Sequence, residues 1–328
     1  MHTECTWKEP LLSIANIRGS EALLPQYLAA QIGLRRSLDD WIPAELLPQF
    51  EIVLAKMGMI LRSDCAFVSL KKSEDAVGLR YSPTTRATGM PWPCALQQDF
   101  EGVRVHVVIS RRPEWAEEAL ESAWYPLVVD GKVIRKPLKD HEWLGHAFGY
   151  PSCCVEAFIR DNEWTKNNIY VEAASRSRHF RWETNCFPKL TAWTTVFHMP
   201  CSFDCKATVQ FSTNLLREIG RFDPTYCCEI ERHMRLPVLA LSERTAFALH
   251  NATNTRGIIS YRGVSDWYAN APNVEPMDRA RHRLLMDGDR LWISNGSVLV
   301  ESEGRPTGVI EAIWQDDVVE APQLICFE

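Results

Sequence analysis

Two short segments in the middle of the chain each place a proline one or two residues before closely spaced cysteines. The first reads Gly-Tyr-Pro-Ser-Cys-Cys over residues 149–154, and the second reads His-Met-Pro-Cys-Ser-Phe-Asp-Cys over residues 198–205. Proline suits the first turn of a helix because its missing N–H would have no partner there. We therefore expect both sets of cysteines at helix starts, where free N–H groups and the positive end of the helix dipole favour thiolate over thiol.

The spacing of these cysteines predicts a shared set of ligands. Cys201 and Cys205 stand one turn apart if a helix runs from Pro200 to Gly220, which would place their Cβ atoms about 5–6 Å apart on one face. Cys153 and Cys154 diverge by about 100° around a regular helix, so it is easier for one of them than for both to face a common site. Together the two helix starts offer three or four thiolates to a metal.

Four interpretations of this ligand set are open. A [4Fe–4S] cluster is the leading one, because facing helix N-termini would stabilise the negative charge of a thiolate-ligated cluster. Zinc is the alternative cofactor, although zinc sites usually use two C-x(2–4)-C pairs and an adjacent Cys-Cys is unusual in that role. A redox-active thiol site and a set of core cysteines without any cofactor are the other two.

The two motifs also resemble those of a known family. The patterns G-Y-P-x-C-C at 149–154 and H-x-P-C-S-x-x-C at 198–205 resemble the paired motifs of an uncharacterised prokaryotic family of unknown function. The resemblance is confined to roughly residues 140–215, which is under a quarter of the chain. It implies that one site, built around iron and sulfur, contains Cys153, Cys154, His198, Cys201 and Cys205. It implies nothing about a substrate.

The other cysteines need separate explanations, because the chain has 11 in all. A disulfide framework is not expected in a reducing compartment or in a chain long enough to build a core. The adjacent pair Cys227-Cys228 starts another predicted helix and could supply a ligand or a resolving thiol, but an apolar stripe beside it favours core packing. Packing or surface positions are also expected for the isolated cysteines, which are Cys5, Cys65, Cys94, Cys186 and Cys326.

Several residues near the motifs are candidates for chemistry. We interpret Cys154 and His198 as catalytic candidates, with His198 as a ligand, a proton donor or simply a helix-cap histidine. His146 could face the same site, whereas His141 and His146 lie five residues apart and therefore cannot form the i, i+4 pair of a zinc protease helix. An Arg-rich connection between the motifs could bind a substrate carboxylate or phosphate, or could be solvated, and its members are Arg176, Arg178 and Arg181.

The pattern of apolar residues predicts an α+β protein in three parts. Residues 1–137 read as a mixed N-terminal domain, 138–236 as a helical domain that carries the cysteines, and 237–328 as a β-rich C-terminal region. The expected helices are 20–32, 44–57, 113–124, 138–148, 151–164, 200–220 and 225–235. The expected strands are 59–70, 103–109, a hairpin at 127–134, 237–241, 257–261, 290–294, 297–301 and 323–327, and 71–100 is expected to be a loop.

Composition narrows the class of function. The formal charge of the 328-residue chain is −6, which argues against nucleic acid as the main partner. No apolar run is long enough to span a bilayer, and the charged first ten residues do not resemble a signal peptide, so we expect a cytoplasmic protein without a membrane partner. The leading hypothesis is an iron–sulfur enzyme, a lyase or sulfur transferase. An open iron would act on a small polar substrate, with an electron or sulfur donor protein as a further partner.

Overall fold

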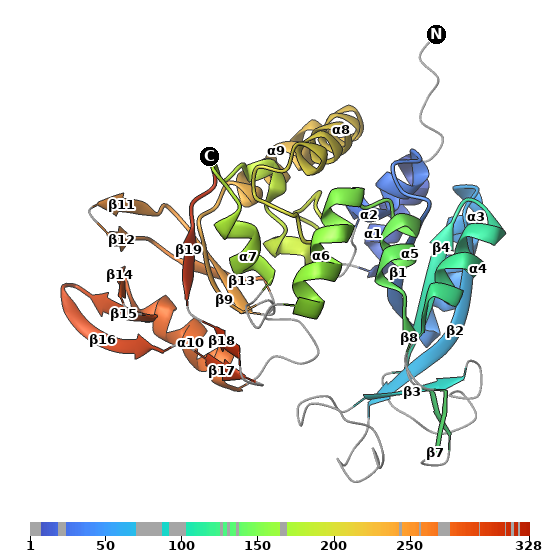
Figure 1. Ribbon diagram of the computed structural model, residues 1–328. Coiled ribbons are helices and arrows are strands. Elements are labelled where there is room, and N and C mark those ends of the chain that lie inside the picture. Colours follow the sequence, from blue (N-terminus) through green and yellow to red (C-terminus); the bar gives the residue numbers. More distant parts are fainter. Residues whose placement is uncertain are drawn as a thin grey trace. The chain divides into compact units, whose positions relative to one another are not determined.

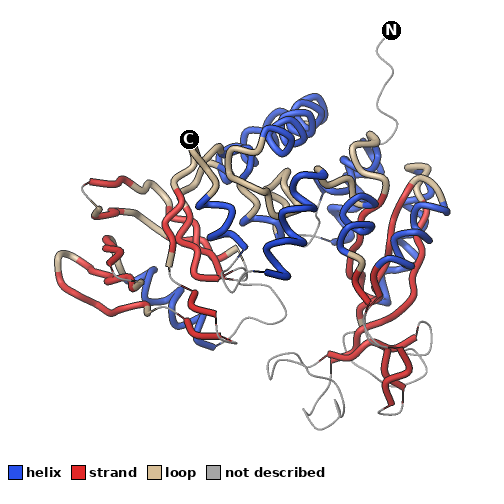
Figure 2. The backbone as a smooth tube through the Cα atoms, in the orientation of Figure 1, coloured by secondary structure: helices blue, strands red, loops and turns tan. Residues whose placement is uncertain are grey.

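The computed structural model in Figure 1 shows a mixed α+β protein, as the sequence predicts. It describes residues 8–18, 24–69, 87–91, 103–124, 127–129, 132–135, 138–164, 169–242, 245–255, 257–267, 276–294, 296–311, 313–315, 318–320 and 322–328. The middle of the chain is helical and the C-terminal part is rich in strands (Figure 2), so the predicted layout is confirmed. No helix in these ranges is long and apolar enough to cross a membrane.

Contacts divide the chain into two compact units, Met1–Val155 and Glu156–Glu328. The division falls inside helix α6 (Ser152–Trp164), which is continuous and has most of its residues in the second unit. The three-part division expected from the sequence, with boundaries after residues 137 and 236, stays a prediction.

The first unit is built on an antiparallel sheet with one parallel pairing. Its strand order is β1-β4-β2-β3-β6-β7, and β3 pairs with β6 in the parallel sense. The strands of the unit are β1 (Ser37–Pro43), β2 (Ile60–Ser69), β3 (Ala87–Pro91), β4 (Arg104–Ser110), β5 (Ala123–Trp124), β6 (Leu127–Val129), β7 (Lys132–Arg135) and β8 (Leu138–Lys139). Its helices are α1 (Lys8–Arg18), α2 (Leu24–Gln31), the 3-10 turn η2 (Ala44–Leu46), α3 (Leu47–Lys56), α4 (Pro113–Ser122) and α5 (His141–Ala147).

Two predictions for this unit need correction. Strand β1 was not predicted: it lies between the expected helices 20–32 and 44–57 and pairs along its whole length with β4. The helix expected from residue 44 begins only at Leu47, so Pro48 occupies its first turn, where no N–H is missed. Within the predicted loop 71–100, the described residues form β3, and the rest lie outside the described residues.

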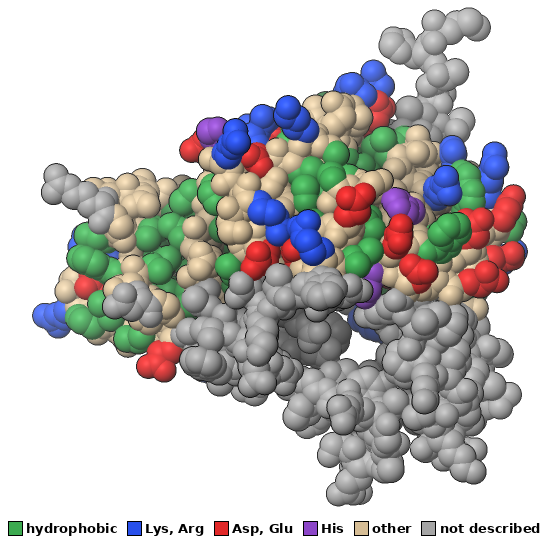
Figure 3. All heavy atoms as spheres, viewed as in Figure 1, with side chains coloured by type: hydrophobic (Ala, Val, Ile, Leu, Met, Phe, Trp, Pro, Cys, Tyr) green, Lys and Arg blue, Asp and Glu red, His purple; other side chains and the backbone are tan. Residues whose placement is uncertain are grey.

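Helix α4 shows how sequence pattern and burial agree. Ala116 and Ala119 are buried, and the helix packs on β2, β4 and α5. Its glutamates lie on the other side, and acidic side chains gather over the α4 and α5 region in Figure 3. The helix therefore buries a narrow face of small residues, and its first turn keeps the acidic residue that the dipole favours.

The second unit begins with helices and ends with sheets. Its helical elements are α6, α7 (Ile169–Ser175), the 3-10 turns η5 (Trp182–Thr184) and η6 (Phe187–Leu190), α8 (Lys206–Phe222), α9 (Pro224–Met234) and α10 (Pro276–Asp287). Its strands are β9 (Val238–Ser242), β10 (Thr245–Leu249), β11 (Thr253–Thr255), β12 (Ile258–Ser260), β13 (Val264–Asp266), β14 (Arg290–Ser294), β15 (Ser297–Ser302), β16 (Arg305–Ile310), β17 (Ile313–Gln315), β18 (Val318–Glu320) and β19 (Gln323–Ile325).

The strands of this unit form two larger sheets with a common core. The described strands pair in the orders β13-β10-β9-β19 and β11-β12-β14-β15-β16, and β17 pairs with β18. Side chains from both sheets and from α10 bury together, among them Phe247, Ile259, Leu285, Leu291 and Val300. The chain passes from one sheet to the other at residues 250–252 and 261–263, so the two sheets are joined at a corner.

A half-buried histidine of helix α9, His233, makes the stability of the protein depend on pH. His233 stacks on Trp193 with ring centroids 4.9 Å apart, and its Nε2 lies 3.0 Å from the Arg232 guanidinium. Burial and then the charge of Arg232 lower the pKa of His233 to about 4, against a partial opposing effect of Glu229. The unfolded chain therefore takes up this proton first as the pH falls from 6.5 towards 4, and the free energy of unfolding decreases over that window.

We expect His233→Gln to lose part of this pH dependence, because glutamine does not titrate. Urea denaturation at pH 7 and at about pH 4.5 measures it. The decrease between the two pH values should be smaller in the variant than in the natural chain. An equal decrease in both would show that His233 does not contribute.

Candidate metal centre

The sulfur atoms of four cysteines gather in one place. The Sγ atoms of Cys153, Cys154, Cys201 and Cys205, called the four-cysteine group below, all lie within 4.8 Å of one another. The Sγ atoms of the adjacent Cys153 and Cys154 are 3.9 Å apart. Cys154 and Cys205 are buried, Cys201 is partly buried and Cys153 is exposed. This group could hold a metal ion, and it contains the four cysteines that the sequence predicts as ligands.

The start of α6 places the first two cysteines. The Pro151 carbonyl accepts hydrogen bonds from the N–H groups of Cys154 at 2.8 Å and Val155 at 3.0 Å, so Pro151 itself is the position just before the helix. Cys153 and Cys154 are then the second and third helical residues, one position earlier than the sequence predicts. Both lie in the first turn, close to the positive end of the dipole.

Gly149 makes the turn that leads into this helix. Its φ is +72°, and a Cβ atom built on it would lie 2.7 Å from the carbonyl oxygen of Leu34. Gly58 has a similar φ of +66°, but a Cβ added there would have no neighbouring atom within 4 Å, which makes Gly58 a matched control. We expect Gly58→Ala to cost about 1–2 kcal/mol for the left-handed backbone alone.

Gly149→Ala should destabilise the protein more than Gly58→Ala, by about a further 1–3 kcal/mol, because the new methyl group also overlaps Leu34. Urea denaturation of the two variants measures the difference. Equal destabilisation would mean that the chain shifts away from Leu34 at no cost.

The segment that carries Cys201 and Cys205 is not helical, which corrects the prediction of a helix from Pro200. Helix α8 begins at Lys206, and Cys205 is the residue before it. The Cys205 N–H donates to the Ser202 carbonyl at 3.1 Å, and the Ser202 hydroxyl donates to Asp204 at 2.6 Å. These local hydrogen bonds favour a turn over a helix, and the same turn brings Cys201 back towards Cys205. The hydrogen bond from Ser202 lowers the pKa of Asp204, although desolvation opposes it.

A neighbouring segment holds this turn in place. The Phe203 N–H donates to the Ser177 hydroxyl at 2.6 Å, and the Phe203 carbonyl accepts from the Arg181 N–H and the Thr184 hydroxyl, both at 2.8 Å. The Phe203 side chain is fully buried and stacks on Phe187. Backbone and side chain of Phe203 are therefore both fixed between the two cysteines.

Arg176 joins the turn to helix α6. Its guanidinium binds the Asp161 carboxylate at two points, with N–O distances of 2.6 and 3.2 Å, and its Nε donates to the Cys201 carbonyl at 2.7 Å. The Asp161 side chain is only 2% exposed and lies on α6, the helix that carries Cys153 and Cys154. Arg176 therefore links helix α6, which carries Cys153 and Cys154, to the turn that carries Cys201.

The other basic candidates have different surroundings. The Arg181 guanidinium pairs with Glu183, with a closest N–O distance of 2.5 Å. The Arg178 side chain is exposed, and its N–H donates to Asp204 at 3.2 Å. A substrate-binding role for Arg176, Arg178 and Arg181 stays a prediction, and for Arg176 it would have to coexist with the pairing to Asp161.

The histidine candidates lie outside the four-cysteine group. His198 is buried, its Nε2 lies 3.0 Å from the Thr208 hydroxyl on α8, and its ring contacts Phe211 edge to face. His146 lies in the last turn of α5 and is exposed. Catalytic roles for Cys154 and His198, and a substrate contact by His146, stay predictions.

The remaining described cysteines are not part of the group. The Cys227 thiol contacts the Leu216 carbonyl at 3.4 Å, and burial and then Cys228 raise its pKa, which disfavours the thiolate. Cys186 is buried beside Met199, and burial raises the pKa of Cys326. Cys65 lies in β2, and the predictions for Cys5 and Cys94 fall outside the described residues.

Two residues of the site's support were not singled out by sequence reasoning. Asp161 looks like an ordinary solvated acid of a helix, and Thr208 looks like an ordinary residue of α8. The only signal for Asp161 was that an acid near the end of α6 stood close in sequence to an Arg-rich connection. Because arginine–carboxylate pairs are common on protein surfaces, that signal does not distinguish a buried ion pair from a solvated one.

The middle of the chain matches a protein-family model. Residues 105–231 match the model of a protein family of unknown function, DUF483. The matched stretch runs from β4 into α9 and contains the whole four-cysteine group. No curated protein and no solved structure matches the chain significantly. The match supports the expectation of an uncharacterised family.

Proposed function

We propose that the four-cysteine group binds one metal ion in a tetrahedral thiolate site, with zinc as the ion. The distances between its sulfur atoms carry this proposal. A tetrahedral zinc site has Zn–S bonds of about 2.3 Å, which places its sulfur atoms about 3.8 Å apart. In a [4Fe–4S] cluster each thiolate binds a different iron, so the ligand sulfurs stand about 6 Å apart. The observed spacing, 3.9 Å for the adjacent pair and at most 4.8 Å for all, is close to the first value.

The surroundings suit a negatively charged centre. Four thiolates around a divalent ion carry a net charge of −2. Cys153 and Cys154 lie in the first turn of α6, and Cys205 is the residue before α8. The N–H groups at a helix start stabilise negative charge next to them. The Arg176 Nε–H group donates to the Cys201 carbonyl next to the group, while Asp161 balances the charge of the guanidinium.

The arrangement supports a role in holding structure together. The ion would join α6, the turn at 201–205 and the start of α8. Two of its ligands, Cys154 and Cys205, are buried, as expected for a closed structural site. We therefore propose a zinc-stabilised module whose fold depends on the metal.

The iron–sulfur enzyme of the sequence analysis is the second candidate, and the exposure of Cys153 favours it. If Cys153 does not bind, the other three cysteines could hold a cluster with one open iron. That iron would act as a Lewis acid on a small polar substrate or take part in sulfur transfer, with an electron or sulfur donor protein as partner.

Metal analysis of protein purified without oxygen separates the candidates. We expect about one zinc per chain, little inorganic sulfide and no absorption near 400 nm, and cobalt substitution should give the intense absorption of a tetrahedral thiolate site. A brown protein with iron and sulfide in equal amounts, bleached by dithionite, would support the iron–sulfur enzyme instead. Protein without metal, in which cysteines of the group form a disulfide, would overturn both.

A further inference from the structure

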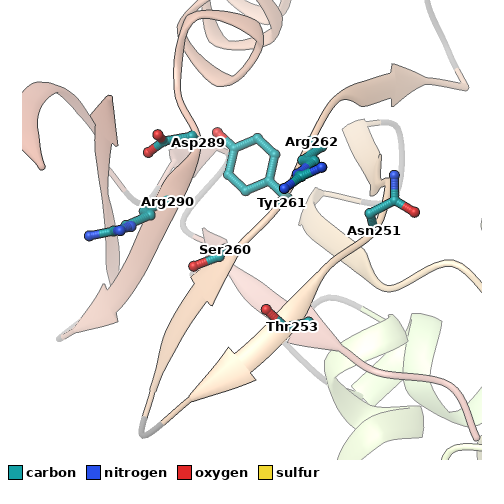
Figure 4. A pocket seen from close by; sticks show the side chains of 7 residues that line it. All are labelled: Asn251, Thr253, Ser260, Tyr261, Arg262, Asp289 and Arg290. Carbon is teal, nitrogen blue, oxygen red and sulfur yellow. The ribbon is translucent and has the colours of Figure 1, made fainter. Parts of the chain in front are cut away.

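A polar hollow of about 670 Å³ lies in the second unit, on the five-stranded sheet near the corner where the chain crosses between the two larger sheets (Figure 4). Strand register explains its floor. Thr253 of β11 lies opposite Ser260 of β12, and Ser260 lies opposite Arg290 of β14, so these three side chains form one row across three strands. The adjacent row, Ile259 opposite Leu291, is buried in the core, which places the polar row on the outer face.

A second arginine flanks the same hollow. Buried Tyr261 separates Ser260 from Arg262, so Ser260 and Arg262 both lie on the exposed side. The Tyr261 hydroxyl donates to the Leu285 carbonyl at 2.8 Å, and the Tyr261 N–H donates to the backbone carbonyl of Asp289 at 2.9 Å. These bonds hold Tyr261 against the residues that precede β14. Gly288 allows this close approach, because a Cβ there would lie 2.8 Å from the Tyr261 hydroxyl.

The two arginines at the hollow differ in their pairing from the arginines of α8 and α9. On α8 and α9, Arg221, Arg232 and Arg235 each pair with a glutamate one turn away. Among the described residues, neither Arg262 nor Arg290 has a carboxylate within 4 Å, although Arg290 lies opposite Glu301 in the sheet. Asp289 also lines the hollow. One oxygen of its carboxylate accepts a hydrogen bond from the Glu303 N–H at 3.2 Å, which partly stabilises its negative charge.

We propose that this hollow binds a small hydrophilic anion, a molecule with phosphate or carboxylate groups and hydroxyls. Arg262 and Arg290 flank the hollow, and because their guanidinium groups point in different directions in Figure 4, each binds a separate charged group of the ligand. The hydroxyls of Ser260 and Thr253 provide further hydrogen bonds, and Asp289 accepts from a hydroxyl of the ligand. The volume is in the range of small-molecule sites, and the polar walls select against apolar ligands. The proposal is independent of the four-cysteine group.

Isothermal titration of the full chain with pyrophosphate and, separately, with citrate tests the proposal and distinguishes phosphate from carboxylate ligands. Arg262→Gln and Arg290→Gln should each weaken the preferred anion about tenfold to a hundredfold, the effect of one charge-assisted contact. Arg305→Gln is the matched control, because Arg305 is an exposed arginine of the same sheet outside the hollow. Thermal melts of all variants check that the fold is kept.

Binding of either anion that needs Arg262 and Arg290 but not Arg305 supports the site. The proposal is overturned if neither anion binds at millimolar concentration. It is also overturned if all three variants lose affinity equally, since that would indicate unspecific attraction to positive charge.

Discussion

Cys205→Ala is expected to lower the metal affinity of the protein by about two orders of magnitude or more, whereas Cys186→Ala should leave it unchanged. Structural zinc bound by four ligands contributes on the order of 10–16 kcal/mol at neutral pH, so one thiolate accounts for about 3 kcal/mol. The two positions form a matched pair, because Cys205 is 6% and Cys186 is 2% exposed and both substitutions leave a small cavity. Only Cys205 belongs to the four-cysteine group.

Metal content after dialysis against a chelator of known affinity measures the effect, and thermal denaturation shows whether metal loss also destabilises the fold. Both variants losing the metal equally would mean that general destabilisation, and not ligation, controls binding. Full retention in the Cys205 variant would remove Cys205 from the ligand set.

Substitutions of the adjacent cysteines Cys153 and Cys154 test which of the two binds the metal. Sequence reasoning expects Cys153 to be the ligand and Cys154 to remain available for chemistry. Burial favours the opposite order, because Cys154 is 2% exposed and Cys153 is exposed. In a four-thiolate site both Cys153→Ser and Cys154→Ser lower metal affinity, with the larger loss in Cys154→Ser. If one variant keeps the full metal content and loses an activity, the second candidate function gains support.

Arg176→Met is expected to destabilise the protein by about 2–3 kcal/mol, because it removes the two-point contact to the buried Asp161 carboxylate, which then keeps only its 3.2 Å contact to Arg160. It also removes the hydrogen bond to the Cys201 carbonyl, so metal affinity should fall in the same variant. Arg178→Met is the control, since Arg178 is two residues away, exposed, and not in a described ion pair. Its effect should stay within about 0.5 kcal/mol.

A double substitution separates the effect of the buried Asp161 charge from the effect of the lost hydrogen bond to the Cys201 carbonyl. Arg176→Met combined with Asp161→Leu removes both charges, so most of the stability should return. The metal affinity should return only partly, because the Cys201 carbonyl still lacks its donor. Urea denaturation and metal titration of the single and double variants measure the two effects. If Arg176→Met keeps both stability and metal, the pairing with Asp161 is of little consequence and the predicted substrate-binding role of Arg176 becomes the better explanation.

Local patterns were enough to predict which cysteines come together and the main elements around them. Pro151 before Cys153 and Cys154 indicates the start of α6, because proline's fixed φ and missing N–H act within one turn. Strand β4 and the β-rich end of the chain followed from runs of β-branched residues and from turn residues, which are also local signals. The α+β class and the choice of the four cysteines therefore needed no tertiary information.

Contacts between distant residues decided the rest. The delayed start of α8 rests on local hydrogen bonds of Ser202 and also on Phe203, which is held by Ser177 and Thr184 from outside residues 200–220. The pairing of Asp161 with Arg176 and the row of Thr253, Ser260 and Arg290 likewise join residues from separate elements. The sequence alone determines which residue types are available and which local conformations they favour. Which buried charge meets which partner, and which polar residues share a surface, depends on the tertiary structure, because those energies arise only when distant segments pack together.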